Sequence, residues 1–212
     1  SSFYLEPDYR CNFYDQLLSK SRLLFMACFP EHFAATTIAE MKGVIDNAGV
    51  SPFWESVGRH FFTMDFAAAD LLTTSSNKNF IANLMPRYPL YVPLLSDAAQ
   101  TVIGQHHTDV EDIVNILEHE GLHFEGHVDI FDAGPILEVR TRHIRAIRHA
   151  EETQVLLGDE VLHGKRILVC NNSCHDFRCI ITRMSHNTLV LSIAQLEGLQ
   201  VAAGNTLTYC RL

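Results

Sequence analysis

Apolar residues recur at helical spacing in several stretches of the chain. An amphipathic helix is predicted from about Tyr14 to Phe29, because leucines and aromatic residues repeat three and four positions apart and Pro30 follows. Ser51 followed by Pro52 predicts a second helix, since serine caps helix starts and proline fits the first turn. Further helices are predicted at residues 77–85, 97–103 and 108–121, the last opened by a Thr-x-x-Glu capping box.

Short apolar or alternating runs predict strands in the remaining segments. The expected strands are 3–5, 36–41, 122–130, 136–139, 166–170, 177–182, 189–192 and 207–210, with an alternating run at 143–149 and a short helix at 194–199. Residues 151–164 show weak periodicity and are predicted to be a linker. The pattern therefore predicts a domain over residues 1–150 and a small β-rich subdomain over residues 151–212.

Composition and charge narrow the class of protein. The chain has 212 residues, of which 47% are hydrophobic and 19% charged, as is usual for globular proteins. No apolar run reaches the roughly 18–20 residues of a membrane helix, and the first ten residues lack a secretory signal, so a cytoplasmic protein without membrane contact is expected. The net charge of −9 argues against nonspecific nucleic-acid binding, but it does not exclude an anionic ligand held by local donors.

The cysteines are expected to be reduced thiols. Cys170, Cys174 and His175 loosely resemble metal ligands, yet the C-x-x-C spacing of structural zinc sites is absent. Cys170 and Cys179 lie in strand-like runs, which favours burial in the core over metal binding. The full set is Cys11, Cys28, Cys170, Cys174, Cys179 and Cys210.

Three histidines four residues apart, His119, His123 and His127, raise the question of a metal site. Gly121 breaks the helix between the first two. In a strand, the second and third lie about 13 Å apart at roughly 3.3 Å per residue, which one ion cannot bridge. We therefore predict no metal site.

Three blocks carry a resemblance to a known family. They are SPFWESVGRHFFTMDFAAAD at 51–70, VIGQHH at 102–107 and GHVDIFDAGP at 126–135. They resemble the arginine/ornithine N-succinyltransferase family, and the similarity extends from about Leu5 to about Arg211. The resemblance implies an α/β (α+β) fold with a GNAT-like mixed sheet flanked by helices. It also implies transfer of succinyl from succinyl-CoA, the co-substrate, to the α-amino group of arginine in arginine catabolism.

The resemblance assigns the acyl-CoA site to the segment from Phe3 to Arg22, where a strand ends and a helix begins. Phe3 on the strand and Arg10 at the start of the loop match the cofactor-binding positions. The family has a Gly-x-Gly pair where this chain has Phe13, Tyr14 and Asp15. Glycine there allows a positive φ and a close approach of phosphate, whereas the aromatic rings obstruct it and the aspartate repels it. The residues thus partly contradict the implied site.

His107 is the predicted catalytic residue, because it aligns with the histidine that the family uses as a proton donor. It directly precedes the predicted Thr108 cap, beside the positive end of a helix, which disfavours an imidazolium. Transfer of an acyl group to an amine needs one proton removed from the ammonium and one delivered to the leaving thiolate. The predicted active site places this imidazole at the sulfur end of the thioester, and the turn at Arg10 holds the diphosphate. A solvated loop histidine is the alternative, and His106 has no family match.

Glu55 and Arg59 are the predicted substrate-binding residues, since a carboxylate can hold a guanidinium through paired hydrogen bonds. They are also four residues apart and could pair with each other on the helix surface. Further candidates for substrate contacts are Glu40, Asp129 and Asp132. Asn83 replaces a family glutamate, which leaves specificity between arginine and ornithine open.

Two alternatives to this enzyme remain. One is a non-catalytic partner subunit or a fragment of the family with a degenerate CoA loop, because the resemblance places the chain's first strand in the middle of the sheet. Its apolar edge would then need another chain to cover it. The other is a different CoA-dependent N-acyltransferase. The family also implies a homo- or hetero-oligomer.

Overall fold

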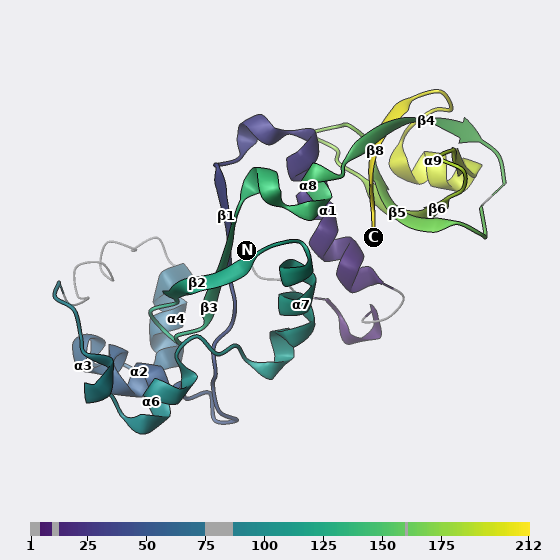
Figure 1. Cartoon of the computed structure of the whole chain (residues 1–212). Coiled ribbons are helices and arrows are strands. Elements are labelled where there is room, and N and C mark those ends of the chain that lie inside the picture. The colour runs from purple at the N-terminus through teal and green to yellow at the C-terminus, as the bar shows by residue number, and fades with distance from the viewer. Residues whose placement is uncertain (1–4, 10–12, 75–86, 160) are drawn as a thin grey trace. The chain divides into compact units, whose positions relative to one another are not determined.

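The computed structural model describes residues 5–9, 13–74, 87–159 and 161–212. The chain divides into two compact units (Figure 1). The first unit comprises residues 1–37, 119–121 and 139–212, and the second comprises residues 38–118 and 122–138. Each unit is described separately below.

The first unit contains a five-stranded mixed sheet. Its strands are β4 (Glu151–Leu157), β5 (Lys165–Cys170), β6 (Cys179–Met184), β7 (Leu189–Leu191) and β8 (Thr206–Arg211). Their order is β6-β5-β8-β4-β7, in which only the β4–β7 pair is parallel. Because side chains alternate between the two faces of a strand, β5 presents Ile167 and Val169 to one face and Leu168 and Cys170 to the other.

A helix packs on each face of this sheet. The short helix α9 (Ile193–Leu199) begins with a capping box of Ser192 and Gln195, and its Leu196 and Leu199 join the core cluster of Ile167 and Val169. The long helix α1 (Tyr14–Cys28) covers the opposite face, where its last residue touches Cys170. Residues 167–170 of β5 are therefore buried on both faces of the sheet.

A buried ion pair anchors α1 to the rest of the first unit. Lys20 Nζ lies 2.9 Å from Glu120 Oε1, and both side chains are almost fully buried. Arg145 in α8 (Arg145–Arg148) adds a second contact to the same carboxylate at 3.3 Å, and the backbone N–H of Ala146 donates to its other oxygen. Two cations and one backbone N–H thus compensate one buried carboxylate. The 3-10 turns of this unit are Pro7–Tyr9, Pro30–His32 and Thr141–His143.

The second unit combines short helices with most of a three-stranded sheet. The sheet has the order β1-β3-β2, built from β1 (Thr36–Glu40), β2 (His123–Val128) and β3 (Pro135–Arg140). The helices are α2 (Pro52–Ser56), α3 (Gly58–Phe62), α4 (Phe66–Thr74), α6 (Asp97–Val102) and α7 (Glu111–His119), with 3-10 turns at Val92–Leu94 and Thr108–Val110. Trp54 is fully buried and packs against Phe62 and Phe131. Ser51 caps the helix that carries Trp54, because its side-chain hydroxyl accepts a hydrogen bond from the Trp54 N–H.

Most predicted elements are confirmed, as is the mixed α/β fold with helices flanking a sheet. The linker prediction was wrong, because residues 151–157 form strand β4, which pairs with both β7 and β8. The alternating run at 143–149 contains the helical turn α8, which was not predicted. The strand at 3–5 and the helix at 77–85 fall largely or wholly outside the described residues. The division at residue 150 remains a prediction. Among the described helices, none is long and apolar enough to span a membrane.

Candidate functional site

The backbone around His107 is fixed by two neighbouring segments of the second unit. The N–H of His107 donates to the carbonyl of Lys42 at 2.8 Å, and His106 pairs with Gly43 in an antiparallel bridge. The N–H of Gly104 donates to the carbonyl of Ala133, and Gly104 adopts a φ of +74°. The histidine is therefore held by backbone contacts on both sides rather than lying on an unconstrained loop.

The ring of His107 caps the 3-10 turn at Thr108–Val110. Its Nδ1 accepts a hydrogen bond from the backbone N–H of Asp109 at 3.1 Å. The predicted cap at Thr108 is thus displaced by one residue, because the imidazole takes the place of a hydroxyl. The ring is about one-fifth exposed. In the described part of the chain, the ring contacts of His107 are made through Nδ1.

Asp109 offers the same ring nitrogen two different partners. Its carboxylate Oδ2 lies 3.3 Å from Nδ1 of His107, close to the 3.1 Å of the N–H contact. The backbone N–H suits a ring whose Nδ1 is unprotonated, and the carboxylate suits a ring that carries a proton on Nδ1. Lys42 Nζ lies 3.4 Å from the same Oδ2. Both protonation states of His107 therefore find a partner without a large movement.

The loop at 129–134, between β2 and β3, carries Asp129 and Asp132 and is called the acidic loop below. It adjoins the segment that holds His107. Asp132 accepts hydrogen bonds from the N–H groups of Gly43 at 2.7 Å and Gly134 at 2.8 Å. A Cβ added at Gly43 would lie 2.4 Å from the carbonyl oxygen of Asp132, so this close approach requires glycine. Residues 42–43 thus connect the backbone of His107 to the acidic loop.

Asp129 is the electrostatically distinct carboxylate of this loop. Burial raises the pKa of Asp129, and the nearby charges of Asp132 and Glu40 raise it further, while the N–H of Phe131 partly opposes the shift. A carboxylate that is costly to ionise gains most from a cationic partner. The loop is chemically suited to a guanidinium or ammonium group.

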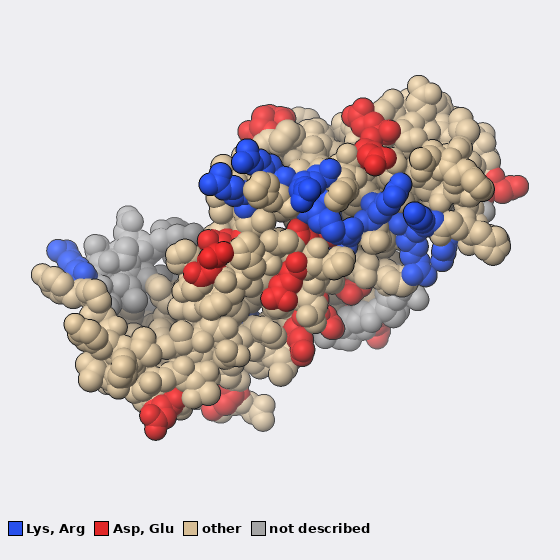
Figure 2. Space-filling model, in the orientation of Figure 1, with Lys and Arg blue, Asp and Glu red and all other residues tan. Residues whose placement is uncertain are grey.

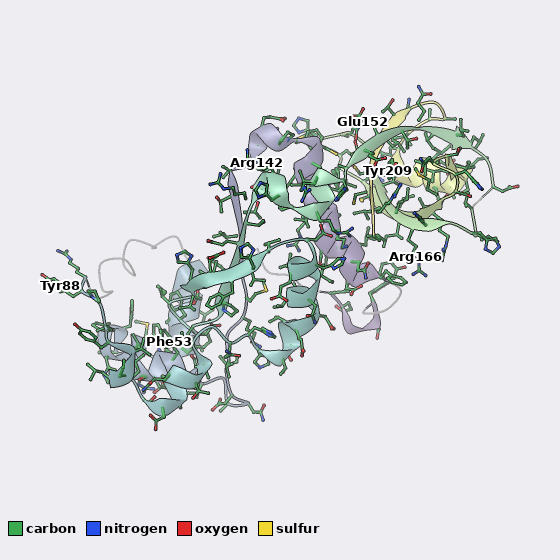
Figure 3. All side chains as sticks on the ribbon, viewed as in Figure 1. Phe53, Tyr88, Arg142, Glu152, Arg166 and Tyr209 are labelled. Carbon is green, nitrogen blue, oxygen red and sulfur yellow. The ribbon has the colours of Figure 1, made fainter. Side chains whose placement is uncertain are left out.

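The first turn of α1 in the other unit carries the residues that replace the family's glycines. Phe13 precedes the helix with a φ of 70°, which meets the expectation that this turn needs a positive φ. The guanidinium of Arg166 in β5, labelled in Figure 3, lies 4.0 Å from the centre of the Phe13 ring. Phe13 and the guanidinium of Arg166 therefore occupy the position where the resemblance implies a glycine-rich turn.

A cavity of about 360 Å³ lies along the same end of α1. Its walls are largely apolar and include two tyrosines whose ring centres are 6.0 Å apart, Tyr9 and Tyr14. The other lining residues are Leu5, Leu17, Leu18, Ser21, Phe177 and Cys179. A cavity thus exists where a strand-to-helix acyl-CoA site is expected, although the loop residues 10–12 lie outside the described part.

The remaining predicted site residues have the following positions. Phe3 and Arg10 lie outside the described residues. Arg59 Nη1 lies 2.9 Å from each oxygen of Glu55, so these two pair with each other on the helix surface, as the alternative interpretation had it. Their substrate role remains a prediction.

Two of the three spaced histidines, His123 and His127, lie beside carboxylates. Nε2 of His123 lies 2.6 Å from Oε1 of Glu125, and Nδ1 of His127 lies 3.3 Å from Oε2 of Glu138. In the described ranges, no group of three or more His, Cys, Asp or Glu side chains is placed to hold a metal ion.

Charge is divided unevenly between the two units. Twelve of the sixteen Lys and Arg residues belong to the first unit, and fourteen of the twenty-five Asp and Glu residues belong to the second. Figure 2 shows the basic side chains gathered over α8 and β5 on the face in view. The first unit is therefore nearly neutral with local basic patches, whereas the second is strongly acidic.

Sequence reasoning missed two of these residues. Asp109 was treated only as part of a capping box, although its position two residues after His107 is a local signal that could have indicated a ring contact. Arg166 is more than 150 positions from Phe13, and no sequence spacing indicates that they meet.

Comparison with known proteins reveals an extended similarity. A family model described as "Arginine N-succinyltransferase beta subunit" matches residues 1–146. An arginine N-succinyltransferase from Yersinia pseudotuberculosis serotype O:3 (strain YPIII) is 44% identical over 97% of this chain, and one from Escherichia coli O139:H28 is 42% identical over all of it. This chain spans 61% and 62% of the lengths of these two relatives.

A solved structure is also similar. It is the arginine/ornithine succinyltransferase subunit AI from Pseudomonas aeruginosa, with a TM-score of 0.87 and 36% sequence identity. The alignment covers 100% of this chain and 61% of that one.

Proposed function

This chain belongs to the arginine N-succinyltransferase β-subunit family, and from this premise we propose that it transfers the succinyl group of succinyl-CoA to the α-amino group of arginine. The observation that carries the proposal is the setting of His107. Its backbone is fixed, and its Nδ1 has a partner in either protonation state, so Nε2 is not needed for these contacts.

The proposed reaction needs two proton movements at one nitrogen. Nε2 of His107 accepts a proton from the α-ammonium, and the amine then attacks the thioester carbonyl carbon directly. As the tetrahedral adduct collapses, the bond to sulfur breaks and the same nitrogen returns the proton to the thiolate. Throughout this cycle Nδ1 keeps its proton, which the Asp109 carboxylate accepts as a hydrogen bond. No covalent intermediate on the protein is needed.

The acidic loop supports arginine as the acceptor. Arginine brings a guanidinium, which forms paired hydrogen bonds with a carboxylate. Burial disfavours the charged form of the Asp129 carboxyl, and a bound guanidinium would stabilise that charge. The excess of acidic residues in this unit also favours a cationic acceptor. We propose Asp129 as its main partner, with Glu55 as a second candidate if it exchanges Arg59 for the substrate.

The cavity beside the first turn of α1 supports a CoA thioester as the donor. We propose that Phe3 and Arg10 bind the co-substrate as the family resemblance implies, and that the cavity lined by Tyr9 and Tyr14 accepts the pantetheine arm. Arg166 adds a guanidinium beside Phe13, where it offsets the repulsion between Asp15 and phosphate. The proposal includes an oligomeric protein in the cytoplasm that uses no metal.

Thiol release tests this proposal against its alternatives. The purified chain is mixed with succinyl-CoA and arginine while free thiol is measured, and succinyl-CoA is titrated separately in a calorimeter. Release that depends on arginine, together with a product heavier than arginine by one succinyl group, supports the proposal. If no thiol is released and succinyl-CoA gives no binding heat, the proposal is contradicted and the non-catalytic subunit is favoured.

Parallel reactions distinguish the remaining possibilities. Acetyl-CoA replaces succinyl-CoA in one series, and ornithine replaces arginine in another. A higher kcat/KM with acetyl-CoA would contradict the succinyl assignment and favour a different N-acyltransferase. A higher kcat/KM with ornithine would contradict arginine as the acceptor while leaving the donor unchanged.

A further inference from the structure

Two cysteines far apart in sequence meet on the α1 face of the five-stranded sheet. Cys28 is the last residue of α1, and Cys170 is the last residue of β5. Their Sγ atoms lie 3.6 Å apart, which is direct contact between two sulfurs. A disulfide bond is about 2.05 Å long, so the two sulfurs need to approach each other by roughly 1.5 Å to form one.

The two thiols have unequal environments. Cys28 is half-buried and reaches solvent, whereas Cys170 is fully buried. The contact with Cys170 lowers the pKa of Cys28, because a hydrogen bond from the neighbouring S–H favours the thiolate, and this outweighs the opposing effect of burial. The same contact, together with burial, raises the pKa of Cys170. Cys28 is therefore the thiol that reacts first with an oxidant, and Cys170 is the less acidic thiol held beside it.

Surrounding groups keep the pair in this arrangement. Cys170 Sγ lies 3.5 Å from the carbonyl oxygen of Thr208, and Cys28 Sγ lies 3.8 Å from Oδ1 of Asn172. The hydroxyl of Thr208 donates to the same Asn172 oxygen at 2.8 Å. Cys179 lies opposite Cys170 in the β5–β6 pairing, but burial raises its pKa, so it is a poor competitor for oxidants.

We propose that Cys28 and Cys170 form an oxidation site, in which a peroxide converts the two thiols into a disulfide bond between α1 and β5. The Cys28 thiolate attacks one peroxide oxygen, the O–O bond breaks, and the departing oxygen leaves as hydroxide and takes up a proton. Cys28 becomes a sulfenic acid. The sulfur of Cys170 then attacks the Cys28 sulfur, releasing water and forming the disulfide. Two thiols are oxidised and one hydrogen peroxide is reduced to two waters.

This inference is independent of the acyltransferase reaction. It rests on contacts within the first unit, and no residue of the proposed reaction takes part in it. The new bond would fix the carboxyl end of α1 to the sheet that it already covers. Oxidation is therefore expected to raise the Tm of the folded chain, because the cross-link restricts the unfolded chain.

Peptide mapping tests the proposal. The folded chain is treated with equimolar hydrogen peroxide, free thiols are blocked with N-ethylmaleimide, and the protein is digested without reduction. We expect a cross-linked peptide pair containing Cys28 and Cys170, loss of two thiols per chain, and full recovery after dithiothreitol. In Cys170→Ser, Cys28 should instead be trapped by dimedone as a sulfenic acid.

Cys174→Ser is the matched control, because Cys174 is exposed but lies outside the pair. It should form the same cross-link at the same rate as the unaltered chain. Three results would overturn the proposal: a link between Cys170 and Cys179, a link involving Cys174, or a Cys28 that stays reduced while Cys174 reacts. Because the mapping is done on the unaltered chain, a variant that fails to fold leaves the test intact.

Discussion

Nδ1 of His107 faces both the backbone N–H and the carboxylate of Asp109, at 3.1 and 3.3 Å. The two contacts favour different tautomers of the neutral ring, so their balance decides which nitrogen exchanges a proton with substrate. The proposed reaction needs the proton on Nδ1. The carboxylate of Asp109 is therefore a positioning group for His107.

Replacing Asp109 by Asn removes the charge but keeps the backbone N–H. We expect kcat to fall about 2- to 5-fold, since the carboxylate is two-thirds exposed and its interaction with the ring is partly screened. Nitrogen NMR of the His107 ring should show a shift toward the tautomer protonated at Nε2. Asp112→Asn, in the first turn of α7, is the control and should change neither. An unchanged tautomer in Asp109→Asn would disprove the positioning role without affecting that of His107.

Asp129→Asn should weaken arginine binding. The amide keeps the hydrogen bond from the Phe131 N–H but loses the charge that pairs with a guanidinium. We expect KM for arginine to rise about tenfold or more, as for a lost charged hydrogen bond, with a smaller change for succinyl-CoA. Steady-state kinetics with each substrate varied measures both. Equal changes in the two KM values would argue against a specific arginine contact.

The same substitution should change how stability depends on pH. The pKa of Asp129 is raised in the folded state, so the folded chain binds this proton more tightly than the unfolded chain. Stability is then lost as the pH rises through the range above the ordinary aspartate pKa of about 3.9. Asp129→Asn should therefore be more stable than the unaltered chain at pH 7 and lose that advantage near pH 3. Urea unfolding between pH 3 and pH 7 measures this difference in the free energy of unfolding. Asp159→Asn is the control, because Asp159 is exposed.

Lys20→Met should strongly destabilise the first unit. It leaves the fully buried carboxylate of Glu120 with only the 3.3 Å contact of Arg145 as a charged partner. Breaking a buried pair from one side costs about 3–5 kcal/mol. Arg59→Met is the matched control, because its pair with Glu55 is exposed and such pairs contribute about 0.2–1 kcal/mol. Urea unfolding measures the free energy of unfolding of both variants. An equal decrease in the two would contradict the burial argument.

Phe13→Gly should improve binding of succinyl-CoA. Glycine adopts the φ of 70° without strain and lets phosphate approach the backbone, while the ring contact with Arg166 is lost. The two effects on stability oppose each other, so we expect a net change within about 1 kcal/mol. KM for succinyl-CoA should fall. Phe13→Ala is the control: it removes the ring but keeps a Cβ in the left-handed turn, so strain remains. A rise in KM in Phe13→Gly would show that the ring itself binds the co-substrate.

The limits of the sequence are visible in particular elements. Helix α1 and the start at Ser51 were predictable because local periodicity and capping define them. Strand β4 was mistaken for a linker because its exposed glutamates and glutamine hide a single fully buried position, Val155. The helical turn α8 was not predicted because its four residues are too few to show a period.

The site divides in the same way. His107 was predicted from a resemblance, but its role as a helix cap was missed because imidazole is an uncommon capping group. The contacts of Lys20 with Glu120 and of Cys28 with Cys170 link residues 100 or more positions apart. Such contacts depend on the packing of α1, which no local pattern encodes.

The central claim is that His107 carries the proton in acyl transfer. Its most direct test compares kcat for thiol release in His107→Ala and His106→Ala, two neighbouring histidines on the same bridged segment. Our account predicts a fall of about 10²- to 10⁴-fold in His107→Ala and a near-normal rate in His106→Ala. A His107→Ala variant that folds and releases thiol at the normal rate would contradict it.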